Sequence, residues 1–524
     1  MNMRTPDLAV LVIYFLGVTL AGLWFARRNR TTDEYFLGNR NFPAWAIGLS
    51  LVGTSISSVT FLAYPADAYK TAWLRMLPNF MLPVAILVAS RVFLPFFRRG
   101  NVTSAFEYLE GRFGPSTRLY GALAFVVGQL VRISLILYLV SLLMHEATGI
   151  DVTWCIVLAG VFVSFYTIAG GIEAVVWTDV IQTIILVIGG AACLLHIVIA
   201  LPGGFGEIIS TALADGKLAF ADPDPVTGEL VPAPWGLSLV EKTASMMLLI
   251  GLTNWLAEYS ANQNVVQRYC ASRSIRDARR AMWVCAWSSV PIWGFFMFLG
   301  TSLYVYYQVF PTPDAQAMLD GTAKAEQILP YFVLRNLWPG FAGLVIAAVL
   351  AAAMSSLDSS LNAISTVGVV DVYKRRIMPL CDDRHYLLAA RLIGIGAAVF
   401  MVGGALVLAE VESQTLQDTA TKISAVTAGG LLGLFGLGFL TRVGDARAAG
   451  VAIAATLLFS VYRALEAVGG PLSTPSLPID PYYTGLLGHA LMFVIGYGLG
   501  LLLPRRERDL TNLTVWTQDR DGVH

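Results

Sequence analysis

The sequence predicts an all-α integral membrane protein with about thirteen transmembrane helices, each of which needs roughly 20 apolar residues. Three observations predict this class. The 524 residues are 56% hydrophobic and 13% charged, whereas a soluble domain carries about 25% charged residues to cover its surface. Long apolar segments recur along the whole chain. Basic residues gather in every second loop between these segments, as the positive-inside rule requires.

The apolar segments set the expected order of spans. The first, 8–25, is followed by Arg27 and Arg28 and by no small-residue cleavage site. We therefore expect it to remain as a helix, not to be removed as a signal peptide. The expected spans lie near residues 7–26, 45–66, 74–97, 119–147, 152–169, 173–200, 240–263, 279–307, 340–369, 386–409, 418–440, 447–466 and 484–503.

The loops predict the orientation in the membrane. If the N-terminus lies outside, the loops on the inner side hold most of the arginines; these loops are 27–44, 98–118, around 170, 264–278, 370–385, 441–446 and the tail after 504. The loops on the outer side hold Lys70, Lys217, Lys324 and Arg335. The positive-inside rule then predicts a multi-pass protein with an outside N-terminus and a cytoplasmic C-terminus.

Composition excludes several classes of function. The net charge is zero, so no overall field attracts nucleic acid. The cysteines form no CxxC pair and the histidines have no zinc or haem spacing. A membrane enzyme would need a nucleophile–base pair or a metal cluster near one face, and the sequence offers neither. The longest outer loop, 201–238, is rich in Gly, Pro and Asp and too short for a soluble domain. We expect no obligate protein partner.

The first unusual segment is Gly53-Thr-Ser-Ile-Ser-Ser-Val-Thr60, in the middle of the second span. Five hydroxyl residues and a glycine at membrane depth predict a broken helix, whose freed carbonyl groups can coordinate a cation. Two structural alternatives remain open. The hydroxyls can bond back to carbonyls one turn earlier, or the small residues can serve a helix–helix contact.

The second unusual segment is Ala352-Ala-Met-Ser-Ser-Leu-Asp-Ser-Ser360, in the ninth span. Ser355, Ser356 and Ser359 recur at helical spacing around Asp358. Their hydroxyl oxygens suit sodium, and a carboxylate supplies compensating charge. A seam of small packing residues is the alternative, but such a seam has no use for a buried carboxylate.

Further ionisable residues lie within the spans. Asp179 is about two turns into the sixth span, where a lone charge requires a cation or hydroxyl groups, whereas Glu173 lies near the inner surface and can simply cap the helix. Arg132 is placed near mid-membrane, where it can neutralise an aspartate or receive a substrate carboxylate. Arg75 and Asn79 lie in the outer half of the third span, and Arg75 can instead extend to the interface.

The order of the spans also predicts an internal repeat. The seventh span has a polar interruption at Asn254, Glu258 and Asn262, five spans after the interrupted second one. This spacing is typical of inverted five-helix repeats whose broken helices form a midplane site. The expected units are a leading helix and loop (1–44), the first repeat (45–200), the outer loop (201–238), the second repeat (239–440), and two trailing helices with a short tail (441–524).

At these residues the sequence resembles the sodium:solute symporter family, which includes sodium–glucose and bacterial sialic acid transporters. The likeness runs through Asp33-Glu-Tyr-Phe-Leu-Gly, Thr103-Ser-Ala-Phe-Glu-Tyr-Leu-Glu-Gly-Arg-Phe, Gly170 to Gln182, Asn264-Val-Val-Gln-Arg-Tyr269 and Ala352 to Asn362. It implies a LeuT-type core of ten helices in two inverted repeats, with one extra N-terminal and two extra C-terminal helices. Sodium is the implied coupling ion.

The resemblance also implies site residues. The main sodium site corresponds to Gly53, Ile56, Ala352, Ser355 and Ser356. A second sodium site, as in bacterial sialic acid transporters, corresponds to Asp179, Ser355, Asp358 and Ser359; an aspartate at 358 departs from the usual serine and can hold a proton instead. The solute pocket corresponds to Ser55, Ser57, Thr60, Arg75, Asn79 and Arg132.

The expected function is sodium-coupled symport of a small organic solute by alternating access. The solute is a sugar or sugar acid, with sialic acid as the first candidate. Asn79 and Arg75 stand where the sialic acid branch has a glutamine and an aromatic residue, which weakens that choice. Two rivals remain: proton coupling through Asp179 and Asp358, and a solute sensor without transport.

Overall fold

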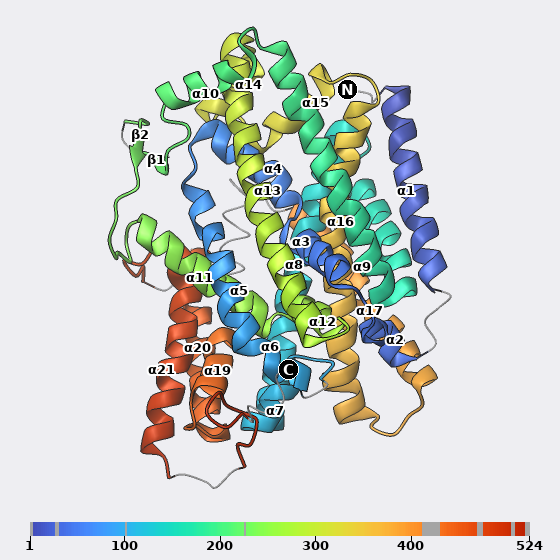
Figure 1. Ribbon diagram of the computed structural model, residues 1–524, viewed down its shortest axis with the longest axis vertical. Coiled ribbons are helices and arrows are strands. Elements are labelled where there is room, and N and C mark those ends of the chain that lie inside the picture. Colours follow the sequence, from blue (N-terminus) through green and yellow to red (C-terminus); the bar gives the residue numbers. More distant parts are fainter. Residues whose placement is uncertain are drawn as a thin grey trace.

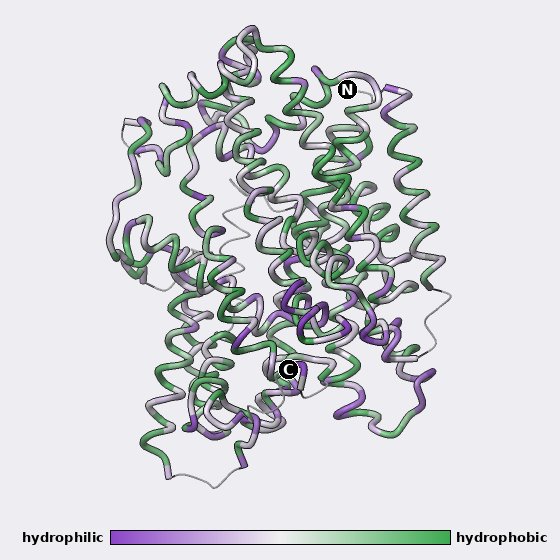
Figure 2. The backbone as a smooth tube through the Cα atoms, viewed as in Figure 1, coloured by the Kyte–Doolittle hydropathy of each residue, from purple (hydrophilic) through white to green (hydrophobic). Residues whose placement is uncertain are grey.

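The structure is a computed structural model that describes residues 4–26, 31–99, 102–224, 227–410, 430–468, 475–504 and 509–518. These residues form a bundle of helices with one small antiparallel hairpin, β1 (Ala221–Pro223) and β2 (Leu230–Pro232), in which Asp222 faces Val231. Figure 1 shows α1 on one side of the bundle, with α20 and α21 on the opposite side. Most residues along the long helices are apolar, as Figure 2 shows.

The long helices follow the expected spans closely. They are α1 (Thr5–Ala26), α8 (Pro115–Thr148), α9 (Val152–Ala200), α13 (Ile275–Val309), α16 (Phe341–Val367), α17 (Asp383–Glu410), α20 (Ala446–Val468) and α21 (Thr484–Leu502). Shorter helices within the bundle are α3 (Ala44–Ser55), α4 (Ser58–Lys70), α5 (Leu82–Arg91), α6 (Phe93–Arg99), α11 (Ala244–Ala261), α12 (Gln263–Cys270) and α19 (Leu431–Leu440), with the 3-10 helix η2 (Leu74–Met81) before α5. The loops carry α2 (Thr32–Leu37), α7 (Glu107–Phe113), α10 (Gly204–Ala214), α14 (Pro313–Asp320) and α15 (Ile328–Asn336).

Within the described residues, nine helices are long and apolar enough to cross a membrane, or ten if the bent pair α3 and α4 forms one span. The expected span at 418–440 is described only in its second half, as α19, because 418–429 lie outside the described residues. The total of thirteen spans therefore stays a prediction.

Helix α9 contains two of the expected spans. Its 49 residues would extend about 73 Å as one straight helix, far more than the roughly 30 Å of a bilayer core. Gly171 breaks it with φ 58° and ψ −159°, a conformation that only glycine adopts readily. The inner loop expected around residue 170 is thus reduced to a single glycine. Residues on both sides of it reach α16, since Tyr166 and Asp179 each hydrogen-bond to that helix.

Both expected helix interruptions are present. The chain is extended at Ile56 and Ser57 between α3 and α4, whose axes differ by 54°. It is extended again at Asn262, between α11 and α12. Helix α12 falls in the segment 264–278, which the sequence predicts as an inner loop. That prediction is wrong for residues 264–270, because they form a helix whose residues are all buried.

Helix α16 forms the centre of the bundle. Of its most apolar stretch, 89% is buried by neighbouring helices, compared with 28% for α1 and for α17. It packs mainly against α9, and also against α8, α1 and α17, and it continues as a π-helix over Gly368–Ile377. A helix covered on all sides can place hydroxyl and carboxyl groups where only protein atoms, and no lipid, surround them.

The start of α16 is capped by a residue of α1. The buried Asp7 accepts hydrogen bonds through Oδ1 from the backbone N–H groups of Gly340, at 2.7 Å, and Gly343, at 3.0 Å. We expect Asp7→Ala to lower the free energy of unfolding by about 1 kcal/mol, because two donors at a helix start lose their acceptor. Thermal unfolding of the purified protein measures this. Asp7→Asn, which keeps an acceptor oxygen, is the control, and an equal loss in both variants would contradict the capping role.

Candidate cation and solute site

The break in the second span releases backbone oxygens near the centre of the bundle. The last helical hydrogen bond of α3 joins Ile56 N to Val52 O, at 2.8 Å. The carbonyl groups that follow Val52 are thus free of the helical pattern and can face a cation. The sequence alone predicts this break from the run of hydroxyl residues, and its cause is local, because Ser57 and Ser58 favour caps over helix interiors.

Gly53 brings this break into close contact with two other helices. A Cβ atom at Gly53 would lie 2.9 Å from Ser355 Oγ of α16 and 3.0 Å from Thr183 Oγ1 of α9. Both distances are too short for a carbon atom that cannot move. Only glycine therefore allows the end of α3 to approach the hydroxyl groups of α9 and α16 this closely.

A small cavity lies at this junction. Four of the five residues predicted for the main sodium site line it, and Gln182, Thr183 and Leu186 of α9 complete it; the four are Gly53, Ile56, Ala352 and Ser355. The fifth, Ser356, is buried beside them, and its hydroxyl lies 3.5 Å from the carbonyl oxygen of Ala352. Neither amide atom of the buried Gln182 has a hydrogen-bond partner within the described residues. Sequence reasoning did not single out Gln182 or Thr183.

Next to the cavity, Asp179 is the acceptor of a dense hydrogen-bond cluster. Its Oδ1 accepts from Ser355 Oγ at 2.5 Å, and its Oδ2 accepts from Ser50 Oγ at 2.5 Å. Arg268 Nη2 donates to the same Oδ2 at 2.9 Å, and both side chains of this ion pair are almost fully buried. Asp179 and Ser355 are brought together as predicted.

Arg268 is the part of the cluster that sequence reasoning missed. Its guanidinium also donates to Ser359 Oγ at 2.5 Å, to Ser50 Oγ at 2.8 Å and to the carbonyl oxygen of Asn264 at 2.7 Å. It therefore connects α12 to α3, α9 and α16, and it balances the charge of Asp179. The motif Asn264-Val-Val-Gln-Arg-Tyr269 was the only signal for it.

Asp358 faces a different set of partners. Its carboxylate accepts from Tyr166 Oη at 2.6 Å and lies 2.5 Å from Thr167 Oγ1, both in the first half of α9. It makes no hydrogen bond to Asp179, Ser355 or Ser359, within the parts of the chain that the structure describes. The predicted second site is therefore divided into two adjacent groups, Asp179 with Ser359 and Asp358 with its own hydroxyl donors.

The residues predicted for the solute lie at the end of α3, in the break that follows it, and on α4, η2 and α8. Asn79 Nδ2 donates to Tyr64 Oη at 2.7 Å, and Arg75 forms an ion pair with Asp67. Both contacts tie η2 to α4. Ser55 and Ser57 are half-buried beside the break, and Thr60 is buried. The last predicted member is Arg132.

Arg132 lies within one of the long helices of the bundle. It is half-buried on α8, and it forms no ion pair with any carboxylate among the described residues. A guanidinium group within a span without such a partner can receive a ligand carboxylate in bidentate geometry.

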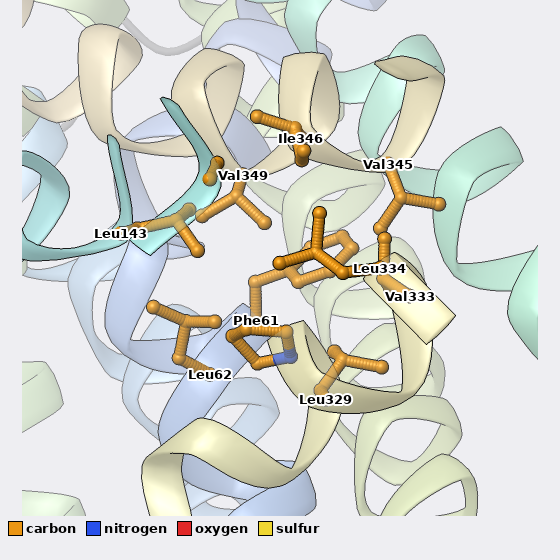
Figure 3. Close-up of a pocket in the computed structure, with 11 residues that line it drawn as sticks. Phe61, Leu62, Leu143, Leu329, Val333, Leu334, Val345, Ile346 and Val349 are labelled. Atoms are coloured by element: carbon orange, nitrogen blue, oxygen red, sulfur yellow. The ribbon is translucent and has the colours of Figure 1, made fainter. Parts of the chain in front are cut away.

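A second cavity lies between α4, α8, α15 and α16, and its lining is entirely apolar. Figure 3 shows Phe61 and Leu62 facing Leu143, Leu334 and Val349 across it. Such a lining offers no hydrogen bond to a sugar, so this cavity is not the place where a polar solute is recognised.

The residues at the first cavity, together with the adjacent Asp179, are of the kinds that bind a hard cation. Carbonyl, hydroxyl and carboxylate oxygens are the ligands that such ions take, whereas softer metals select sulfur and imidazole. Among the described residues, no group of three or more His, Cys, Asp or Glu side chains could hold a metal ion of that softer kind.

Known proteins of similar sequence and structure are transporters. The chain is 33% identical over 450 residues to the sodium/sialic acid symporter SiaT of Proteus mirabilis, which covers 86% of this chain and 88% of that protein. It is 29% identical over 466 residues to the human sodium-coupled monocarboxylate transporter 1, with 86% and 71% covered. A solved structure of a sodium-coupled sialic acid symporter in a substrate-bound, outward-open state has a TM-score of 0.84 and 31% identity, with 96% of this chain and 99% of that chain covered.

A helical membrane bundle with broken spans beside a buried cluster of hydroxyl and carboxylate groups is typical of a cation-coupled secondary transporter. Residues 35–443 match the model of the sodium:solute symporter family. The chain belongs to the sodium:solute symporter family. It is a sodium-coupled symporter with a LeuT-type fold, and not an enzyme.

Proposed function

We propose that the coupling sodium ion binds in the cavity at the break between α3 and α4. Gly53, Ile56 and Ala352 offer carbonyl oxygens, and Ser355 and Ser356 offer hydroxyl oxygens. The observation that carries this proposal is that four of these five residues line one small cavity formed by α3, the break and α16. A sodium ion there would join the broken span to the central helix, so that its binding and release change how the two elements pack.

We propose a second cation position at Asp179, Asp358 and Ser359. Charge counting supports it, because Asp179 and Asp358 carry two negative charges against the single positive charge of Arg268, all three almost completely buried. One added cation would neutralise this cluster. A proton on one carboxylate would do the same, and transport measured without sodium separates the two ions.

The proposed solute is a sugar or sugar acid that carries a carboxylate, with sialic acid as the first candidate. Arg132 supports the carboxylate, because its charge has no partner among the described residues. The hydroxyl groups of Ser55, Ser57 and Thr60 and the amide group of Asn79 are proposed to bind the hydroxyls of the sugar. Arg75 is proposed as the last member of this pocket, and 38% of its side chain stays exposed in its ion pair with Asp67.

Transport is proposed to proceed by alternating access in a bacterial inner membrane, with the N-terminus outside and the C-terminus in the cytoplasm. The repeats 45–200 and 239–440 would move relative to each other around the site, and 441–524 would add the trailing helices. No obligate protein partner is proposed. The membrane potential would add about 2.3 kcal/mol per sodium charge per 100 mV to the driving force.

Uptake into proteoliposomes tests this function. Radiolabelled sialic acid, glucose and simple sugar acids are supplied with and without an inward sodium gradient at one fixed pH. Sodium-driven uptake of a sugar acid supports the proposal. If a proton gradient drives uptake equally well, the second cation is a proton and not a sodium ion. Binding of a solute without any flux would favour a sensor, and driven uptake of glucose alone would overturn the carboxylate assignment.

Arg132→Gln is expected to weaken the apparent affinity for a carboxylate solute roughly 10- to 150-fold, because a charge-assisted hydrogen bond contributes about 1.5–3 kcal/mol. The solute concentration at half-maximal uptake measures this, and the sodium concentration at half-maximal uptake should stay unchanged. The control is a solute whose carboxylate is replaced by an amide. The wild type should bind the amide more weakly than the carboxylate, whereas the variant should bind both with the same affinity. If the variant still binds the carboxylate more tightly, Arg132 does not recognise this group.

A further inference from the structure

Arg279 of α13 contacts the end of α5. Its Nε donates to the carbonyl oxygen of Ser90 at 3.2 Å, and Ser90 is buried in the last turn of α5. The side chain of Arg279 is half-buried, and the other N–H groups of its guanidinium have no acceptor within the described residues. These groups form a planar fork that matches two oxygens of a phosphate. One contact therefore holds Arg279 in place, and its remaining donors are available to a ligand.

A second arginine lies at the same junction. Arg91 directly follows Ser90 and is exposed, so its flexible side chain begins beside the Arg279 guanidinium. Neither arginine forms an ion pair in the part of the chain that the structure describes. Asp277, on the first turn of α13, is instead 3.9 Å from Arg280. Two neighbouring cations repel each other, and an anion bound between them removes this cost.

The surface of α13 beyond these arginines is suited to lipid. Arg279, Trp283 and Trp287 follow each other at intervals of four residues, which places them on one face of the helix. The two indole rings are stacked with their centroids 6.2 Å apart, and Trp287 is 70% exposed. Basic and tryptophan side chains in this order are typical of the boundary between lipid headgroups and acyl chains. In Figure 1 the first turns of α13 lie near α5 and α6.

We propose that Arg91 and Arg279 bind the headgroup phosphate of an anionic phospholipid, whose acyl chains lie along Trp283 and Trp287. Basic pockets between spans on the cytoplasmic side are sites where anionic headgroups bind, and the proposed orientation places this end of α13 on that side. A free phosphate would satisfy the arginines and leave the tryptophans uncovered, whereas a phospholipid satisfies both.

The bound phosphate joins two parts of the protein that are proposed to move. Helix α5 belongs to the first proposed repeat and α13 to the second, and the two arginines come one from each. Helix α13 also packs tightly along α3, since a Cβ at Gly48 would lie 2.6 Å from a side-chain carbon of Val284. The lipid site is separate from the cation cavity, so its test does not depend on the identity of the solute.

Thermal unfolding of the full-length protein in a neutral detergent tests the site. Phosphatidylglycerol, phosphatidylcholine or inorganic phosphate is titrated into wild type and into Arg91→Gln/Arg279→Gln. Phosphatidylglycerol should stabilise the wild type more than phosphatidylcholine does, because its headgroup carries a net negative charge. The double variant should bind phosphatidylglycerol about 30-fold more weakly, because each basic residue near an anionic lipid contributes roughly fivefold to binding.

Arg384→Gln/Arg391→Gln is the matched control. It removes two exposed arginines of α17 that also form no ion pair among the described residues, and it should keep the wild-type response to phosphatidylglycerol. Arg91→Gln alone keeps the contact between Arg279 and Ser90, so it should fold like the wild type and bind the lipid roughly fivefold more weakly. This single variant decides the question if the double variant is poorly folded.

Native mass spectrometry of the same samples counts the lipids that stay bound. Wild type should retain one more phosphatidylglycerol molecule than the variants of Arg91 and Arg279. The proposal is overturned if phosphatidylglycerol and phosphatidylcholine stabilise the wild type equally, or if these variants keep the wild-type affinity. Equal stabilisation by inorganic phosphate would show a site for free anions and would overturn the assignment to a lipid.

Discussion

Arg268→Gln is expected to lower the free energy of unfolding by about 3–5 kcal/mol, which would leave little folded protein. Asp179 and Arg268 are both almost fully buried, and their atoms Oδ2 and Nη2 are 2.9 Å apart. Removing one partner of such a pair leaves an uncompensated charge in a medium that solvates it poorly, and this is far more destabilising than the loss of a surface ion pair. The yield of folded protein and its unfolding temperature in detergent measure the effect.

The double variant Asp179→Asn/Arg268→Gln separates the charge from the shape of the site. It removes both charges and keeps side chains that can still hydrogen-bond, so most of the lost stability should return. A double-mutant cycle then yields a large coupling energy between the two residues. Additive losses would contradict the assigned ion pair. Arg91→Gln, at the exposed end of α5, is the control for removing an arginine and should change stability little.

The architecture could be predicted largely because membrane spans obey one-dimensional rules. The length of each apolar segment predicts a helix, and the described helices follow the expected spans to within a few residues, as α8 and α17 show. The break at Ile56 was also predictable, since hydroxyl residues and a glycine in mid-span disfavour a continuous helix. Each of these signals is local in the sequence.

Arg268 shows where such rules stop. Helix α12 carries Gln263, Asn264, Gln267 and Arg268, a pattern that resembles an exposed inner loop, yet all of these residues are buried. Distant partners bind two of these side chains: the backbone near Thr103 binds Gln263, and Asn362 binds Gln267. Hydropathy indicates the average environment of a segment. It does not indicate which hydrogen-bond partners, about a hundred residues away in the sequence, a buried polar side chain will meet.

The same limit applies to the carboxylates. The sequence identified Asp179 and Asp358 as functional because buried charge is rare in a span, but it could not assign their partners. Tyr166 and Thr167, which bind Asp358, precede the kink at Gly171, whereas Asp179 follows it. Only the fold shows that residues on the two sides of this kink contact neighbouring positions of α16.

Ser355→Ala is expected to abolish the sodium dependence of uptake. Ser355 lines the proposed sodium cavity, and its hydroxyl is also the donor to Asp179 Oδ1 at 2.5 Å. Alanine removes an oxygen ligand and leaves this carboxylate with one donor fewer. Uptake with a sodium gradient should fall to the level measured without one. Sodium binding itself is read from thermal unfolding, since an ion at 100 times its Kd stabilises the wild type by about 2.7 kcal/mol.

Ser360→Ala is the matched control on the same helix. Ser360 is as buried as Ser355, and its hydroxyl also donates one side-chain hydrogen bond, to Gln129 Oε1 at 2.8 Å, but it does not line the cavity. Ser360→Ala loses a hydrogen bond to a neutral amide, which costs about 0.5–1.5 kcal/mol, and Ser355→Ala loses one to a carboxylate, which costs about 1.5–3 kcal/mol. Both unfolding temperatures should therefore fall without sodium, more so for Ser355→Ala, and only Ser355→Ala should lose the stabilisation that sodium adds. Normal sodium activation in Ser355→Ala would show that the ion binds elsewhere in the bundle, because removing a ligand must lower the affinity of a site for its ion.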